Sequence, residues 1–215
     1  MKRIIISLSV LGAALLAAGC NTTGSSRNLG DPAVPGKVLA QQVCSNCHGI
    51  DGNSTNPTFP KLSGQQPEYI VSELKEFRAH DRTTPAAQSY MWGIARALTN
   101  KQINQLAAYF SSHKNIPDKA DNAKLIAEGK DIYVNGIPGA PACANCHGAD
   151  GAGGGNGAFP RIAGQHADYI TKQLWVFKDT NQRPDGTLMK AITNGVPKSI
   201  TAEQIKAVSM YLSTI

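Results

Sequence analysis

The sequence is poor in aromatic residues, in cysteine and in long apolar runs. Each of these scarcities narrows the classes of protein to which the chain can belong. Aromatic residues make up 6% and hydrophobic residues 41% of the 215 residues, which is lean for the cores of one or two domains. No cluster of Lys and Arg with interleaved aromatics occurs, so nucleic-acid binding is not expected despite the net charge of +6. No strand pattern is visible, and the apolar residues recur with helical spacing. We therefore expect an all-α protein whose cores need additional apolar volume.

Cysteine is too scarce for a disulfide framework, because the chain has five and four of them belong to two copies of one motif. The copies are Cys44-Ser45-Asn46-Cys47-His48 and Cys143-Ala144-Asn145-Cys146-His147. C-x-x-C-H is a c-type haem attachment motif, in which two thiols on one helical turn form thioether bonds and the histidine becomes an axial ligand. A zinc ribbon has its Cys pairs roughly 15–20 residues apart, and a redox C-x-x-C lies in a βαβ unit. The sequence therefore favours two covalent haem c groups, which would also supply apolar volume, over zinc or a dithiol centre.

The longest apolar run, residues 4–18, is too short to span a bilayer comfortably. It follows Lys2 and Arg3, the charged start of a secretory leader. We expect residues 1–19 to be a signal peptide and the mature protein to be exported to the periplasm. Export agrees with the haem prediction, because bacterial c-type haem is attached outside the cytoplasm.

The leader ends in a sequence that resembles a bacterial lipobox, Leu16-Ala17-Ala18-Gly19-Cys20. In that pattern Cys20 becomes the first mature residue and carries lipid on its sulfur, although Ala17 stands where Leu is commoner. Ordinary signal-peptidase cleavage, with Cys20 lost or free, is the alternative. Residues 20–31 are small and polar, typical of a flexible tether. We expect a membrane-anchored lipoprotein.

An internal duplication organises the rest of the chain. Residues 59–65, Phe-Pro-Lys-Leu-Ser-Gly-Gln, recur at 159–165 as Phe-Pro-Arg-Ile-Ala-Gly-Gln. Each repeat ends in an apolar helix that begins with a capping box, opened by Thr99 in one and Thr201 in the other. The expected parts are a first domain over 32–115, a linker over 116–122 and a second domain over 123–215.

The second repeat differs from the first around its motif. Its first helix is expected over roughly 123–134 and is separated from the motif by a Gly/Pro-rich segment. Residues 151–157 contain five glycines but lack the Gly-Lys-Ser/Thr of a phosphate loop. We expect this segment to be a tight surface loop near the haem edge.

The second axial ligands are sought among residues that recur in both repeats. Met91 and Met189 correspond, and each lies at nearly the same distance after its motif histidine. A lone Met often fills a gap in a core, but its matched recurrence favours iron ligation. A thioether ligand raises the reduction potential and closes the iron to substrates, which argues against catalysis. Three histidines have no matched counterpart and are expected at the surface, namely His80, His113 and His166.

Pro60 and Pro160 occupy equivalent loops about a dozen residues after each motif. An axial histidine needs a hydrogen-bond partner at its other ring nitrogen, and a loop carbonyl at either proline suits this role. The alternative is that the prolines only stiffen a turn.

These motifs together resemble di-haem class I c-type cytochromes, and most closely the cytochrome c4 family. The resemblance covers nearly all of residues 32–215. It implies two cytochrome c folds facing each other across a pseudo-twofold axis, with the haems near the domain interface. It also implies carbonyls of Pro60 and Pro160 that accept from His48 and His147.

The function expected from these features is electron transfer rather than catalysis. Upstream partners would be a quinol or cytochrome complex or a dehydrogenase, and the downstream partner a haem–copper terminal oxidase of a respiratory chain. A di-haem enzyme such as a peroxidase is disfavoured by the matched Met residues. A cytochrome subunit of a larger dehydrogenase or oxidase complex remains an overlapping alternative.

Overall fold

The computed structural model describes residues 27–194 and 200–215. The predicted signal peptide over 1–19, Cys20 and most of the tether over 20–31 lie outside these residues. Within the part of the chain that is described, no helix is long and apolar enough to cross a membrane.

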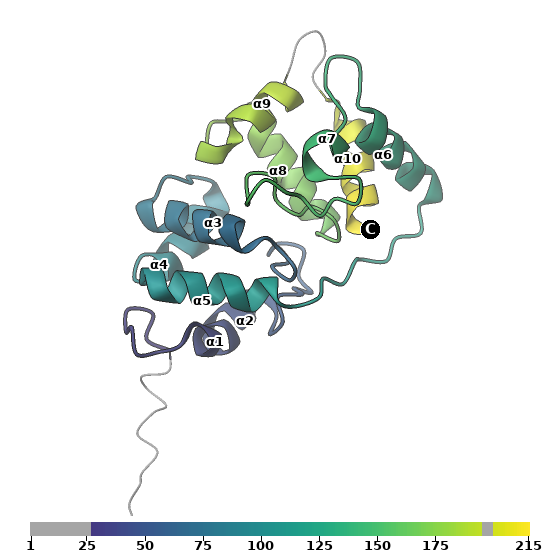
Figure 1. Cartoon of the computed structure of the whole chain (residues 1–215). Helices are drawn as coiled ribbons and strands as arrows, with labels where there is room; N and C mark the ends of the chain where they lie inside the picture. Colours follow the sequence, from purple (N-terminus) through teal and green to yellow (C-terminus); the bar gives the residue numbers. More distant parts are fainter. Residues whose placement is uncertain (1–26, 195–199) are drawn as a thin grey trace, which may run out of the picture.

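The all-α prediction is confirmed, since the described residues form helices and, in place of strands, two isolated bridges. The first repeat contains α1 (Gly36–Leu39), η1 (Ala40–Cys44), α2 (Ser45–His48), α3 (Pro67–Ala79), η2 (Ala87–Met91), α4 (Trp92–Ala95) and α5 (Asn100–Ser111). The second contains α6 (Ala123–Asn135), α7 (Ala144–His147), α8 (Ala167–Asp179), η3 (Pro184–Gly186), α9 (Thr187–Thr193) and α10 (Ala202–Ser213). The two sets form two bodies side by side (Figure 1). α3 lies on the side of the first body that faces the second, and α8 lies on the facing side of the second body.

Both predicted capping boxes are present. The backbone N–H of Gln102 donates to Thr99 Oγ1 over 3.2 Å, and Gln102 Oε1 accepts from the backbone N–H of Thr99 over 3.0 Å. Thr201 and Gln204 repeat this arrangement at the start of α10. The boxes satisfy N–H groups that have no partner inside the helix, so the start of each last helix is fixed by local sequence.

Each repeat has its own apolar core, built around its last helix. In the first repeat the most deeply buried side chains are Leu39, Ile103, Leu106 and Phe110. In the second they are Tyr133, Ile205, Val208 and Leu212. Each core is small, and each motif cysteine pair packs its first member, Cys44 or Cys143, against it. Each haem attachment motif therefore packs against the edge of the apolar core of its own repeat.

The first and last helices of each repeat cross at a glycine. A Cβ on Gly36 of α1 would overlap the Cβ of Gln105 in α5, and a Cβ on Gly129 of α6 would overlap the carbonyl of Ala207 in α10. Gln105 and Ala207 occupy equivalent positions after Thr99 and Thr201. Both repeats therefore use a missing side chain to bring two helix backbones into contact.

The segment between the repeats runs from 112 to 122 and connects α5 to α6 (Figure 1). Lys61 Nζ donates to the carbonyl of Ile116 over 2.6 Å and pairs with Asp118 over 2.5 Å. The backbone N–H of Asp118 donates to the carbonyl of Ser213 over 2.8 Å. The connection is thus bonded to both repeats, which limits their relative motion.

Replacing Gly129 by Ala is expected to destabilise the second repeat by about 2 kcal/mol or more, because the helix backbones must separate. For a chain of this size this corresponds to a fall in Tm of roughly 4–8 °C, measurable by calorimetry. Gly93→Ala is the matched control, since a Cβ there meets nothing within 4 Å in α4. Equal Tm changes in the two variants would contradict this account of the crossing.

Candidate haem sites and the contact between the repeats

The two C-x-x-C-H motifs adopt the same helical turn. Cys44 ends η1 and is followed by α2, and Cys143 stands immediately before α7. A helical turn places residues i and i+3 on one face, so both thiols and the following histidine point to one side. Each turn ends at a glycine with positive φ, Gly49 at 80° and Gly148 at 81°, a conformation that other residues rarely adopt.

The motif histidines are buried, each residue being 8% exposed. The ring of each donates a hydrogen bond to a proline carbonyl. His48 Nδ1 lies 2.9 Å from the oxygen of Pro60, and His147 Nδ1 lies 2.9 Å from the oxygen of Pro160. A carbonyl can only accept, so Nδ1 carries the proton and Nε2 keeps its lone pair. Burial lowers the pKa of both histidines, against the opposing effect of the carbonyls. Each is therefore a neutral imidazole with one nitrogen fixed and the other available to a metal.

The motif cysteines lack the character of a redox dithiol. Burial raises the pKa of the Cys44 thiol to about 11 and that of Cys143 likewise. Reactive C-x-x-C pairs have a lowered pKa on the attacking thiol, the opposite direction. Among the described residues the only cluster of three potential metal ligands is Glu73, Glu76 and Asp185, so the cysteines do not gather into a zinc site. Two thiols and a neutral imidazole on one turn fit covalent haem attachment.

The two matched methionines lie on equivalent segments after α3 and α8. Met91 ends η2 and packs against the same core as Cys44. Met189 lies in α9, and its side chain is half-buried. Neither is in a fully packed core position, which is the arrangement expected if each faces a bound group.

The prediction that the three unmatched histidines are surface residues is wrong for His166. His80 is exposed and stacks on Trp92, and His113 is half-buried. His166 is 6% exposed and spans the repeats, with Nδ1 2.9 Å from Asp118 Oδ2 and Nε2 2.8 Å from the carbonyl of Ser54. Its partners lie far away in sequence, so no local pattern marked it as buried.

The repeats contact each other through two glutamines that mirror one another. Gln165 accepts from the backbone N–H of Lys61 over 2.8 Å and donates to the carbonyl of Lys61 over 2.9 Å. Gln65 does the same to Arg161, at 2.8 Å for both bonds. Residue i of one repeat bonding to residue j of the other, and the reverse, is the signature of a twofold relation. We refer to these four hydrogen bonds as the glutamine clamp.

The glycine-rich loop over 151–157 is part of this contact rather than a free surface loop. Gln66 Nε2 donates to the carbonyls of Phe159 and Ala152 over 2.7 and 3.3 Å, and Gln66 Oε1 accepts from the N–H of Gly157 over 2.8 Å. A Cβ on Gly157 would come within 2.7 Å of the backbone nitrogen of Tyr69. The glycines therefore let this loop lie against the first repeat.

A buried group of charges joins α3 to the segment after α8. Glu73 pairs with Arg183 over 2.5 Å and with Arg82. Both guanidinium groups also reach across the contact, Arg183 to Tyr69 and Arg82 to Tyr169. Burial alone would lower the pKa of Arg82, but the Glu73 carboxylate reverses this and raises it, so the guanidinium stays charged. The residue equivalent to Glu73 is Gln173, whose Oε1 accepts from both arginines, and Asp185 is a second carboxylate paired with Arg183.

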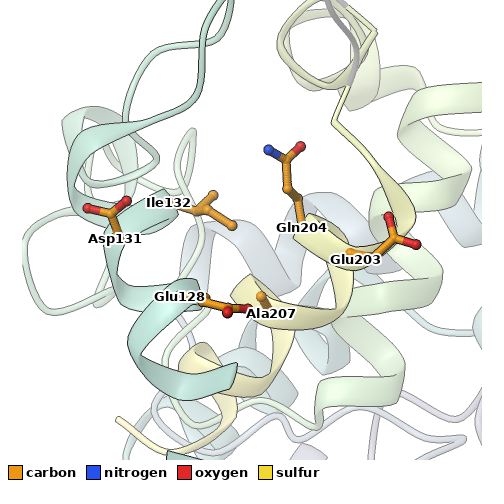
Figure 2. Close-up of a pocket in the computed structure, with 6 residues that line it drawn as sticks. All are labelled: Glu128, Asp131, Ile132, Glu203, Gln204 and Ala207. Carbon is orange, nitrogen blue, oxygen red and sulfur yellow. The ribbon is translucent and has the colours of Figure 1, made fainter. Parts of the chain in front are cut away.

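A groove between α6 and α10 lies apart from these groups (Figure 2). Its lining residues are Glu128, Asp131, Ile132, Glu203, Gln204 and Ala207. None of the motif cysteines or histidines lines it, so it is not part of the candidate haem sites.

Comparison with known proteins identifies the class to which these sites belong. The cytochrome c family model matches residues 33–114 and again residues 126–215. The chain therefore belongs to the cytochrome c family, and its two motifs hold two covalently bound haem c groups.

Within that family the chain is similar to cytochrome c4 and to a related electron acceptor over nearly its whole length. It is 37% identical to cytochrome c4 of Stutzerimonas stutzeri, over 99% of this chain and 98% of the relative. It is 35% identical to a thiosulfate dehydrogenase electron acceptor of Thiomonas intermedia, over 98% and 90%. The structure of reduced cytochrome c4 from Pseudomonas stutzeri superposes with a TM-score of 0.72 at 36% identity, covering 84% of this chain and 96% of that one. The protein is thus a di-haem, cytochrome c4-like electron-transfer protein, as the sequence resemblance indicated.

The buried charge group gives a prediction for the pH dependence of stability. Glu76 has one oxygen, Oε2, buried without a hydrogen-bond partner. Burial, then repulsion from Glu73 and Asp185, raises its pKa to about 7. The unfolded carboxyl titrates near 4.5, so ionising Glu76 costs more in the folded state, and stability falls as pH rises from about 4.5 through 7.

Glu76→Gln removes that titration and should raise Tm relative to the parent protein at pH 8 but not at pH 4. Because the side chain is partly exposed, the expected gain is small, roughly 1–3 °C. Thermal scans across this pH range measure it, and Glu128→Gln, at an exposed position of α6, is the control with the same charge change. A Tm difference between Glu76→Gln and the parent that stays constant with pH would show that the assigned titration is wrong.

Proposed function

We propose that this protein is an exported electron carrier whose two haems are each held by a motif histidine and a methionine. Cys44 and Cys47 would form the thioether bonds of the first haem, with His48 and Met91 on its iron. Cys143, Cys146, His147 and Met189 would do the same for the second. The haems supply one-electron chemistry, and the chain holds the ligands, fixes their orientation and excludes small molecules.

The observation that carries this proposal is the pair of buried imidazoles, each with Nδ1 donating to a proline carbonyl. A carbonyl partner fixes the ring and makes Nε2 a better ligand. Pro60 and Pro160 are thus proposed to orient the axial ligands rather than only to stiffen their turns. The same geometry in both repeats argues for two equivalent carriers in place of one carrier and one catalytic centre.

Methionine as the second ligand excludes peroxidase chemistry, because a closed iron offers no position for peroxide. Met91 and Met189 follow the helices α3 and α8 at matched places, and neither is locked into a packed core. A sulfur ligand also favours ferrous iron, so the proposed carrier has higher potentials than one with two nitrogen ligands.

Two partners are proposed for the electrons. The first is a haem–copper terminal oxidase of a respiratory chain, fed from a quinol or cytochrome complex. The second is a dehydrogenase that uses this protein as its acceptor or subunit. Relatives named as a thiosulfate dehydrogenase electron acceptor and as a cytochrome subunit of sulfide dehydrogenase support this second candidate. Reduction by a purified dehydrogenase or oxidation by a purified oxidase distinguishes the two.

Met91→Ala tests the ligand assignment. It should lower the potential of the first haem by roughly 0.1 V or more, a modest part of the ~0.8 V span that axial ligands set, and let carbon monoxide bind that haem alone. Spectroelectrochemistry and carbon monoxide titration of the reduced protein measure both effects. The parent protein should titrate reversibly at two haems and bind no carbon monoxide.

Met210→Leu is the matched control, because Met210 lies in α10 and is not one of the recurring pair. It should leave both potentials and the carbon monoxide response unchanged. Rapid carbon monoxide binding by the parent protein would argue for an open, enzyme-like haem. An unchanged spectrum in Met91→Ala would mean that another group holds the iron.

Lipidation of Cys20 is tested by the intact mass of the protein purified from a host that matures c-type cytochromes. The expected mass is that of residues 20–215 with two haems and a lipid group, and Cys20→Ala should give a protein that leaves the membrane fraction. A mature chain that starts elsewhere, or an unmodified Cys20, would favour ordinary signal-peptidase cleavage.

A further inference from the structure

The peptide group that holds each motif histidine is itself held by the other repeat. The Pro60–Lys61 peptide accepts from His48 Nδ1 through its oxygen and donates to Gln165 Oε1 through its N–H. The Pro160–Arg161 peptide accepts from His147 Nδ1 and donates to Gln65 Oε1. A continuous chain of hydrogen bonds therefore runs from each motif histidine, through one peptide group, to a side chain of the opposite repeat.

The glutamines are fixed in this role. Gln65 and Gln165 are each 9% exposed, and both side-chain amides are bonded at oxygen and nitrogen. Each Oε1 also accepts from the next backbone N–H in its own repeat, at 2.9 Å from Gln66 and 3.0 Å from His166. Because a backbone N–H can only donate, the orientation of each amide follows from its partners.

A hydrogen bond at a peptide N–H strengthens the acceptor at the other end of the same peptide. Amide resonance moves electron density from nitrogen to oxygen, and bonding the N–H increases that shift, a cooperative gain of about 10–30% per bond. A stronger acceptor draws the Nδ1 proton of the histidine and makes Nε2 more basic. A more basic axial ligand stabilises ferric over ferrous iron.

We propose that Gln165 and Gln65 are positioning residues that lower the reduction potential of the haem in the opposite repeat. Gln165 acts on the first haem through Pro60–Lys61 and His48, and Gln65 acts on the second through Pro160–Arg161 and His147. This inference rests on the proposed function, in that His48 and His147 are the axial ligands. It adds that the reduction potential of each haem depends partly on a residue of the domain that does not bind that haem.

The test is a crossed pair of substitutions in the haem-loaded full chain. Gln165→Met keeps the side-chain length but removes both polar groups, and it should raise the potential of the first haem only. The expected shift is about threefold in the ferrous-to-ferric ratio, or ~30 mV for one electron. Gln65→Met should shift the second haem only. Potentials are read haem by haem from NMR-monitored redox titration, with signals assigned through contacts to each motif.

A second readout separates ligand tuning from loss of packing. In the ferrous protein the Nδ1–H resonance of His48 should move upfield in Gln165→Met, as its hydrogen bond weakens, while that of His147 stays in place. Gln66→Met is the control, since Gln66 makes three bonds across the same contact but none to the Pro160–Arg161 peptide. It should change stability without the haem-specific shift. Should Gln165→Met not fold, Gln165→Asn places its amide too far from Lys61 and is expected to act with the same sign.

The outcomes separate this inference from the function on which it rests. Equal shifts of both haems in all three variants, a shift confined to the mutated repeat, or no shift would each overturn the inference while leaving an intact carrier. Absence of two reversible haem couples in the parent protein would overturn the proposed function as well.

Discussion

The hydrogen bond from each motif histidine to a proline carbonyl constrains most of the structure around it. To accept from His48, the carbonyl of Pro60 must approach the turn that follows the motif, and Gly49 with its positive φ allows the chain to leave that turn. His147, Pro160 and Gly148 repeat the arrangement. The loop that carries the carbonyl then presents its next peptide to the other repeat. The same loop therefore orients the motif histidine and forms the contact between the repeats.

The contact is symmetric in its backbone bonds and asymmetric in its charges. The glutamine clamp treats both repeats alike, but Glu73 has Gln173 as its counterpart. Glu73 pairs with both buried arginines, Asp185 adds a second carboxylate beside Arg183, and the arginines bond to tyrosines across the contact. Removing one partner of such a buried group leaves an uncompensated charge, which typically costs about 3–5 kcal/mol.

The sequence allowed the local features to be predicted and left the long-range ones open. The capping boxes at Thr99 and Thr201 and the haem motifs depend on residues a few positions apart, so their spacing was informative. The recurrence of Gln65 and Gln165 was visible, but recurrence alone does not tell which residues touch. The lack of a matched histidine predicts His166 at the surface, and this is wrong because its partners, Asp118 and Ser54, come from distant segments. The iron–methionine bonds remain predictions, because spacing and half-burial indicate them without measuring them.

The mutual contacts of the glutamine clamp have a consequence for how such a chain can arise. A single repeat supplies both sides of the contact, namely a glutamine and the backbone groups to which a glutamine bonds. Two copies of one repeat can therefore associate without any new residue. Covalent linkage through 112–122 then acts as an increase in effective concentration, which turns a weak encounter into a permanent pairing. Once the halves are fused, each is free to diverge, and the difference between Glu73 and Gln173 is one that only a fused, non-identical pair can keep on one side.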